Sequence, residues 1–215
     1  NGAGTQAISG PATIGQGALP NLTVNKSTGA LTTSGKLTLA GASTITAGTL
    51  SLVDDSTFND DVTVQSGGTL SCITGGKTLR FKQAKTLTVQ SGGFLTLNGA
   101  SGSLLTLDRN TGDTANWKIN AAAGYVYNIG YVSANYSDAT GYPTIYTSAD
   151  STLTSCVNWN NSASTWTWVG GASGATTDWN TPANWSPASV PGAGADVRIP
   201  LTTYKPTLST STTIK

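Results

Sequence analysis

Aliphatic residues alternate with Thr or Ser in short triplets that recur along the first half of the chain. An alternation with a period of two places the aliphatic side chains on one face of a strand and the hydroxyls on the other. Corners that contain Gly separate the triplets, so the pattern predicts short strands joined by tight bends. The triplets lie at residues 22–24, 37–39, 50–52, 62–64, 87–89, 95–97 and 105–107.

Two near-copies indicate that this pattern is a repeat. They are LTVQSGGFLTL at residues 87–97 and VTVQSGGTLSC at residues 62–72, and their Gly-Gly pairs lie 25 residues apart. The aliphatic residues that precede successive corners align at steps of 21, 19 and 25 residues, at Val24, Ile45, Val64 and Val89. Repeats of this length are typical of solenoids in which one repeat forms one coil.

We therefore predict an all-β fold for residues 21–160, a right-handed parallel β-helix (β-solenoid) with coils of about 19–25 residues. A sandwich or an up-and-down barrel would fit the same alternation. However, most corners lack the Asn-Gly and Asp-Gly signals of hairpins, and stacking explains why a corner recurs together with its flanks. Outward hydroxyls could form a Thr ladder, although the uneven steps argue against a regular face. Residues 1–20 are predicted to be an irregular lead-in or cap.

The second half of the chain has a different composition. Aromatic residues enter from Trp117 onward, and we interpret them as filling the last, wider coils of the stack. Four Trp spaced by Gly, Pro and Asn then predict a small Trp/Gly-rich loop module over residues 161–200, held together by ring packing. Residues 201–215 predict a strand-like tail that starts a further coil or a stack of subunits, with Leu208, Thr213 and Ile214 as the assembly residues.

The motifs of residues 166–200 resemble those of large secreted bacterial surface proteins. They are Trp-x-Trp-x-Gly-Gly, Asp-Trp, Asn-Trp and Val-Pro-Gly-x-Gly-x-Asp-Val-x-Ile-Pro. In proteins of this adhesin or filamentous-haemagglutinin-like type, right-handed β-helical stretches are punctuated by Trp-Gly-rich segments. The resemblance implies a secreted or cell-surface protein, and a new helix that opens at residues 196–215. It also implies head-to-tail copies of the chain, or further repeats of a longer parent chain, as partners. The resemblance implies no active site.

The amino-acid composition limits the partners and the reactions that we expect for this chain. Charged residues make up 10% of the chain, the net charge is +1, and Glu, His and Met do not occur. A neutral balance argues against nucleic acid as a partner, and no apolar run approaches the roughly 20 residues of a membrane span. General acid–base and Ser-His-Asp chemistry lack their usual groups. We therefore expect no catalysis, and rank a β-helical polysaccharide lyase or hydrolase third.

One acidic cluster could carry chemistry, namely Asp54, Asp55, Asn59, Asp60 and Asp61. Its oxygens are a weak candidate for a Ca²⁺ site, although the spacing matches no Asp-x-Asp-x-Asp-Gly loop. Converging carboxylates could also serve glycoside cleavage. A solvated turn is the simpler interpretation, because Asp and Asn are ordinary turn residues.

Three functions follow in order of preference. The first is a structural, adhesive surface protein whose solenoid mediates self-association, filament assembly and display. The second is a glycan-binding adhesin domain, in which exposed rings of Trp179, Trp185, Tyr136 and Tyr142 would stack on sugars. The third is the polysaccharide-cleaving enzyme. In an oxidising compartment, Cys72 and Cys156 could form one disulfide, or both could be small core residues.

Overall fold

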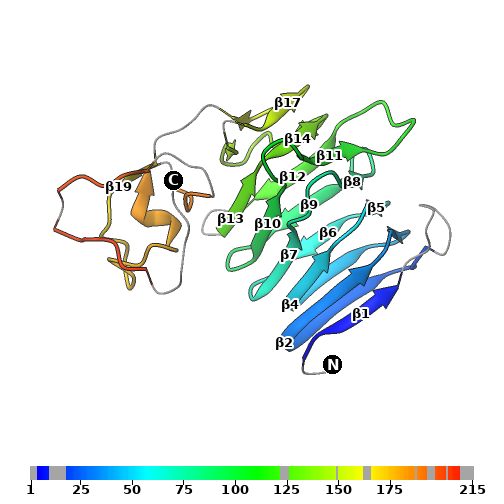
Figure 1. Ribbon diagram of the computed structural model, residues 1–215, viewed down its shortest axis with the longest axis horizontal. Helices are drawn as coiled ribbons and strands as arrows, with labels where there is room; N and C mark the ends of the chain where they lie inside the picture. The colour runs from blue at the N-terminus through cyan, green and yellow to red at the C-terminus, as the bar shows by residue number, and fades with distance from the viewer. Residues whose placement is uncertain are drawn as a thin grey trace.

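A computed structural model of the chain describes residues 4–9, 18–121, 126–148, 150–161, 166–186, 188–192, 197–201 and 203–208. Within these ranges the chain is all-β, and the one helical element is a 3-10 turn at Pro182–Asn184. The two largest sheets are parallel throughout, and their strands lie side by side from β1 to β17 (Figure 1). The prediction of an all-β fold with parallel sheets is confirmed.

Three rows of strands make up the two sheets. The six-stranded sheet is the first row, and the ten-stranded sheet contains the other two, joined by the long strands β2 (Leu22–Ser34) and β4 (Ser43–Leu52). The first row is β3 (Leu37–Leu39), β5 (Ser56–Phe58), β8 (Thr78–Phe81), β11 (Leu105–Arg109), β14 (Val132–Asn135) and β17 (Thr152–Thr154). Besides β2 and β4, the second row contains β6 (Val62–Val64), β9 (Thr86–Val89), β12 (Trp117–Ala121) and β15 (Ser137–Asp138). The third adds β7 (Gly68–Cys72), β10 (Phe94–Asn98) and β13 (Val126–Gly130), with β1 (Gln6–Ser9) beside the end of β2.

The chain visits the three rows in a fixed order, and we call each set of three consecutive strands a rung. The rung β5–β6–β7 is followed by β8–β9–β10 and then by β11–β12–β13. Each strand pairs in parallel with the strand at the same place in the next rung. A short parallel pair, β16 (Ile145–Tyr146) with β18 (Trp159–Asn160), closes the last rungs.

The predicted repeat register is confirmed. Val24 lies directly opposite Ile45, Ile45 opposite Val64, and Val64 opposite Val89. The rungs become longer than predicted further along, because Val89 pairs with Ala121, 32 residues away. The additional residues lie in the loops between strands, so the strands stay in register. Uneven steps therefore do not break the outward Thr ladder, and Thr23, Thr44, Thr63 and Thr88 are consecutive strand partners.

The Gly-Gly corners also stack on one another. Gly67 adopts a φ of 82°, in the left-handed region that suits Gly, and a Cβ on Gly68 would lie 2.2 Å from the Ile45 carbonyl oxygen. The Gly67 N–H donates to the Gly92 carbonyl at 2.8 Å, and the Gly48 N–H donates to the Gly67 carbonyl at 3.1 Å. Only Gly fits this approach of one corner to the next.

Inward-facing side chains form columns that run through the rungs. One column is aromatic: the rings of Phe58 and Phe81 stack with centroids 5.3 Å apart, and those of Phe81 and Trp117 with centroids 4.5 Å apart. Trp159 completes it edge-on, 6.4 Å from Trp117. Trp117 and Trp159 are therefore part of a column that begins two rungs before Trp117.

Both ends of the chain differ from the predictions. Residues 6–9, which fall in the predicted irregular lead-in, form strand β1. Strand β21 (Val197–Arg198) pairs in parallel with β19 (Trp166–Trp168), and β20 (Trp185–Ser186) pairs with β19 on the other side. The described part of the motif that the resemblance assigned to a new helix thus completes the small sheet of the Trp module.

Replacing Phe81 with Ala tests the aromatic column. The change leaves a cavity between Phe58 and Trp117, and we expect the free energy of unfolding to fall by about 3–5 kcal/mol in urea titrations. Ile73→Ala is the control, because this side chain is 66% exposed, and its effect should stay within about 0.5 kcal/mol. A loss below about 1 kcal/mol for Phe81→Ala, an ordinary value for a point substitution, would contradict a continuous column.

Candidate functional site

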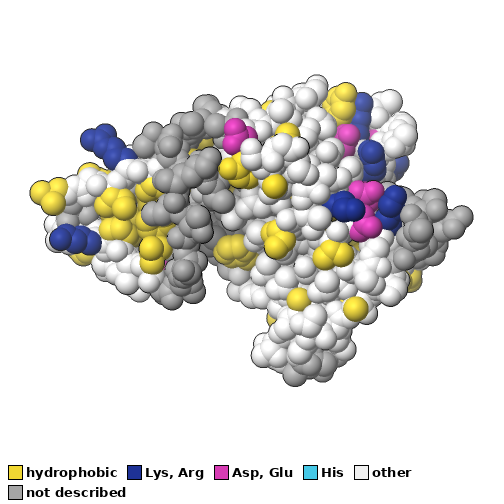
Figure 2. Space-filling view, viewed as in Figure 1, with side chains coloured by type: hydrophobic (Ala, Val, Ile, Leu, Met, Phe, Trp, Pro, Cys, Tyr) yellow, Lys and Arg dark blue, Asp and Glu magenta, His cyan; other side chains and the backbone are white. Residues whose placement is uncertain are grey.

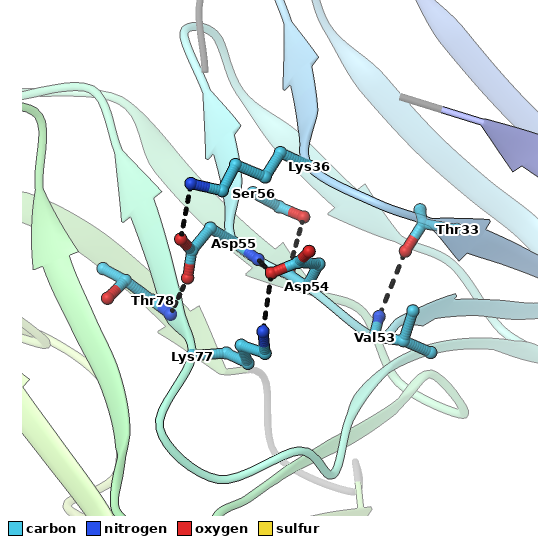
Figure 3. Close-up of polar contacts among 8 residues, drawn as sticks. All are labelled: Thr33, Lys36, Val53, Asp54, Asp55, Ser56, Lys77 and Thr78. Carbon is cyan, nitrogen blue, oxygen red and sulfur yellow. Dashed lines mark hydrogen bonds and ion pairs between the residues drawn. The ribbon is translucent and has the colours of Figure 1, made fainter. Parts of the chain in front are cut away.

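The acidic cluster is divided by strand β5, and its first half faces lysines of the neighbouring rungs. Asp54 Oδ1 lies 2.9 Å from Lys77 Nζ, and Asp55 Oδ2 lies 3.5 Å from Lys36 Nζ (Figure 3). Asp55 also accepts a hydrogen bond from the Thr78 backbone N–H at 2.9 Å. The hydrogen bond from Lys77 holds the pKa of Asp54 below its usual value.

The second half of the cluster is engaged in the same way. Asp60 forms an ion pair with Lys85, whose hydrogen bond lowers the pKa of this carboxyl. Asp61 accepts the Thr86 backbone N–H at 2.8 Å, and Asn59 Oδ1 accepts a hydrogen bond from Asn110 Nδ2 at 2.7 Å. No group of three or more His, Cys, Asp or Glu side chains in the described ranges could hold a metal ion. The described contacts of Asp54, Asp55, Asn59, Asp60 and Asp61 are thus with lysines, backbone N–H groups and Asn110, and they do not favour the weak Ca²⁺ candidate.

Ion pairs connect one rung to the next throughout this part of the molecule. Arg80 and Asp108 are direct strand partners with Nη1 and Oδ2 3.9 Å apart, and Lys82 Nζ lies 2.6 Å from Asp113 Oδ1. Over the stacked sheets, Lys and Arg side chains lie beside Asp side chains, whereas those at the far left of the view lie apart from them (Figure 2). Exposed pairs of this kind each contribute about 0–1 kcal/mol to the free energy of unfolding. Their main effect is therefore to fix how neighbouring rungs are aligned.

Asp113 is the one buried carboxylate of this network, with 4% of its side chain exposed. It accepts hydrogen bonds from Lys82 Nζ at 2.6 Å and from the Gln83 backbone N–H at 2.7 Å. Burial raises the pKa of Asp113, but the two hydrogen bonds and the nearby charges of Lys82 and Arg109 outweigh it, so the pKa is lowered overall.

Trp179 and Trp185 form the core of the Trp module, so the prediction of exposed rings for sugar stacking is wrong for both. Each is 2% exposed, and their ring centroids lie 4.6 Å apart. Trp168 contacts both rings, and Trp185 Nε1 donates to the Trp179 carbonyl at 2.8 Å. The prediction that ring packing holds the module together is confirmed.

Asn184, which sequence reasoning missed, fixes the backbone around these rings. Its buried amide accepts the Ala172 N–H at 2.8 Å and donates to the carbonyls of Ala175 and Asp178 at 2.6 and 2.9 Å. The signal for it was its place in Ala-Asn-Trp, directly before a core ring. One side chain thus joins three segments of the loop.

The two tyrosines that were candidates for glycan binding have different surroundings. The guanidinium of Arg109 lies 3.7 Å above the ring of Tyr136, on a face that a sugar would otherwise use. Tyr142 is 42% exposed, and its carbonyl accepts a hydrogen bond from Asn158 Nδ2 at 2.6 Å. Tyr142 is therefore the one exposed residue of the four candidates.

The two cysteines are free, so the alternative of a disulfide is wrong. Cys72 lies in the core column between Leu52 and Leu97, whereas Cys156 follows β17, four rungs further along. At roughly 4.8 Å per rung this separation far exceeds the Cα distance that a disulfide spans. Burial raises the pKa of both thiols, most directly for Cys72 in the core.

The tail begins on the Trp module. The Thr207 N–H donates to the Thr177 carbonyl at 2.6 Å, and the Trp179 N–H donates to the Thr207 carbonyl at 3.1 Å. The next residue, Leu208, is 46% exposed. Thr213 and Ile214, the other two predicted assembly residues, lie outside the described residues.

Comparison of the chain with protein-family models, with curated proteins and with solved structures finds no match. In the described part of the chain, no helix has the length and apolar character that crossing a membrane requires.

Asp113→Asn tests the buried ion pair. Because the pKa of this carboxyl is lowered by folding, its stabilisation is present above the unfolded pKa near 3.9 and is lost as the pH falls through the folded pKa. We expect the variant to lose about 1–3 kcal/mol at pH 7, and the difference from the unmodified protein to shrink below about pH 4 in urea titrations.

The control is Asp150→Asn, since this residue is exposed, and it should change stability little at either pH. An Asp113→Asn penalty that stayed constant down to pH about 3, below the ordinary Asp pKa, would contradict a stabilising charge.

Proposed function

We propose that the chain is a right-handed parallel β-helix that serves as a structural, non-catalytic domain of a secreted or cell-surface protein. Its rungs associate edge to edge with copies of the chain, or with further repeats of a longer parent chain. The observation that carries this proposal is the pairing of the first and last rungs, because both leave a strand edge open among the described residues.

At the N-terminal end, the first part of β2 has one described neighbour. Residues Leu22, Thr23 and Val24 pair with β4, whereas β1 covers only residues 31–34 of β2. The Leu22 N–H donates to the Ala42 carbonyl at 3.1 Å, on the β4 side. Because backbone groups alternate in direction along a strand, the Thr23 N–H and carbonyl face the open side.

At the opposite end, β17 pairs with β14 and with no other described strand. All strands of the two large sheets run parallel, so the two ends of the stack present edges of the same direction. Because β17 ends the first row and the open part of β2 begins the second, an added copy would pair with each edge separately, in the same parallel direction. Heterologous contacts generate filaments when the rotation between copies does not close a ring, and strand addition to a sheet edge supplies the affinity.

The ion-pair network favours a structural role over carbohydrate cleavage. Cleavage of a glycosidic bond requires two carboxylates that flank one bond and remain free to exchange protons or attack. The carboxylates of residues 54–61 instead bind lysines or backbone N–H groups of neighbouring rungs. We therefore assign them to rung alignment.

Thr23→Pro tests edge association. Proline removes the open-side N–H of Thr23 and leaves the Leu22 hydrogen bond to β4 in place. We expect the unmodified chain to form filaments with increasing concentration, seen by electron microscopy and sedimentation velocity. The proline variant should raise the concentration required at least about tenfold, which corresponds to about 1.4 kcal/mol.

The matched control is Thr23→Val, which changes the same side chain but keeps the backbone N–H, and it should assemble like the unmodified chain. A strictly monomeric unmodified chain at high concentration, or equal assembly of both variants, would contradict the proposal.

A further inference from the structure

The outer end of the Trp module exposes several large apolar side chains. Val169, Ile199 and Tyr204 are 46%, 49% and 43% exposed, and Leu201 is 100% exposed. The module already has a core of four buried Trp rings, so these side chains lie outside a core that is complete. Single exposed apolar residues are ordinary on a protein surface, whereas a group of them marks a site of interaction.

The end of strand β19 is where these residues meet. Strands β19 and β21 run side by side in parallel, with Thr167 opposite Arg198. Val169 follows the end of β19 and Ile199 follows the end of β21, so the two lie at the same end of the pair. The Arg198 side chain is exposed beside them.

Tyr204 is held against the same end of β19. Its carbonyl accepts a hydrogen bond from Trp168 Nε1 at 2.5 Å, and a Cβ on Gly170 would lie 2.8 Å from the Tyr204 Cβ. Lys205, which is exposed, follows directly, and Leu201 comes shortly before it in the chain. We call the six exposed residues of this end the module tip: Val169, Arg198, Ile199, Leu201, Tyr204 and Lys205.

The charge of the module tip is positive and is not balanced within the described residues. Arg198 and Lys205 form no ion pair with any of them. Asp178 is the one acidic residue in the described part of the module, and it accepts hydrogen bonds from Thr181 Oγ1 at 2.7 Å and from the Asn180 N–H at 3.2 Å. At the far left of Figure 2, hydrophobic side chains and Lys or Arg side chains share the surface without an acidic neighbour.

A second copy of the chain is a poor partner for this positive charge. Five Asp side chains already form ion pairs with Lys or Arg, at residues 54, 55, 60, 108 and 113. Asp61 and Asp138 accept hydrogen bonds from the backbone N–H groups of Thr86 and Thr140. Because most described carboxylates are engaged, the anionic groups that complement the tip are best supplied by another kind of molecule.

The shape of the module tip favours a fluid partner. The cavities beside Tyr127 and Val190 lie between the module and the stacked sheets, and no tip residue lines them. Leu201 instead projects with its whole side chain exposed. A projecting aliphatic side chain is buried most readily by a surface that can rearrange around it, such as the boundary between lipid headgroups and acyl chains.

We propose that the module tip binds the surface of an anionic lipid bilayer. Ile199 and Leu201 enter the boundary between headgroups and acyl chains, where burial of apolar area drives binding. The Tyr204 ring has an apolar body and a polar hydroxyl, which suits the same depth. Arg198 and Lys205 attract the lipid phosphates. The contact is peripheral, and the chain lies on the bilayer.

The lipid contact is independent of the proposed edge association. The tip consists of residues that follow β19 and belong to or follow β21, and it includes no residue of the open edges of β2 and β17. Thr23→Pro should therefore bind lipid like the unmodified chain at concentrations where both are monomeric, and the two proposals fail separately.

The test is cosedimentation of the purified chain with vesicles of phosphatidylcholine, alone or mixed with phosphatidylglycerol. We expect binding to the mixed vesicles and at least about tenfold weaker binding to phosphatidylcholine alone, because the cations then lose their counter-charge. Raising the salt concentration from about 0.1 to 1 M shortens the screening length from about 10 to 3 Å. It should therefore weaken binding to the mixed vesicles.

Leu201→Ser removes an inserted side chain and should weaken binding to the mixed vesicles about tenfold. Arg198→Gln combined with Lys205→Gln should reduce binding to that seen with phosphatidylcholine alone. All three positions are exposed, so the melting temperature should not change. The matched controls are Ile73→Ser and Lys118→Gln, which alter one exposed apolar and one exposed cationic residue of the stacked sheets, and both should bind normally.

The proposal is overturned if the chain does not bind the mixed vesicles, if it binds phosphatidylcholine alone equally well, or if the tip variants bind like the unmodified chain. Soluble poly-aspartate distinguishes an acidic protein as the partner. If it displaces the chain from vesicles and binds Leu201→Ser as tightly as the unmodified chain, the tip recognises acidic polypeptide, and the lipid proposal is overturned as well.

Discussion

The in-register parallel pairing of rungs is the constraint on which the rest of the structure depends. When Ile45, Val64 and Val89 face one another across three strands, every inward side chain of those rungs falls into a column. A shift of one residue would turn each aliphatic side chain outward, because the side-chain period of a strand is two. Any additional residues must therefore be placed in loops, as they are where Val89 pairs with Ala121. The Gly-Gly corners and the ion pairs between rungs follow from this same register.

Part of this organisation could be read from the sequence because it is local. The alternation of aliphatic and hydroxyl residues places Val24, Ile45, Val64 and Val89 correctly, and the near-copies place the corners. The alternatives that the structure does not favour concern side chains whose partners are distant in the sequence. Lys77 pairs with Asp54 and Lys85 with Asp60, across 23 and 25 residues. The sequence near each carboxylate does not indicate such a partner. Ring packing of the four Trp residues was predicted, but the sequence left open whether Trp179 and Trp185 also face sugars, since composition indicates a ring cluster but not which rings it encloses. The rungs after Val89 were predicted too short because loop residues carry no periodic pattern.

The same physical reasoning separates what the fold uses internally from what it leaves available. Its charged side chains largely form ion pairs between rungs, and most of its indole N–H groups donate to backbone carbonyls or to serine hydroxyls. The open strand edges at the ends of the stack are a feature that contacts among the described residues do not explain. They are the basis of the proposed edge association.

The most direct measurement of the rung register is a distance between two residues of one outward column. Thr23 and Asn120 are four strands apart in the column Thr23, Thr44, Thr63, Thr88 and Asn120. Spin labels on cysteines at these positions, in a chain with Cys72→Ala and Cys156→Ala, can be measured by pulsed EPR. Stacking at roughly 4.8 Å per strand predicts a narrow distribution near about 20 Å. A broad distribution, or a mean beyond about 30 Å, the span of roughly six strand spacings, would contradict the stacked register.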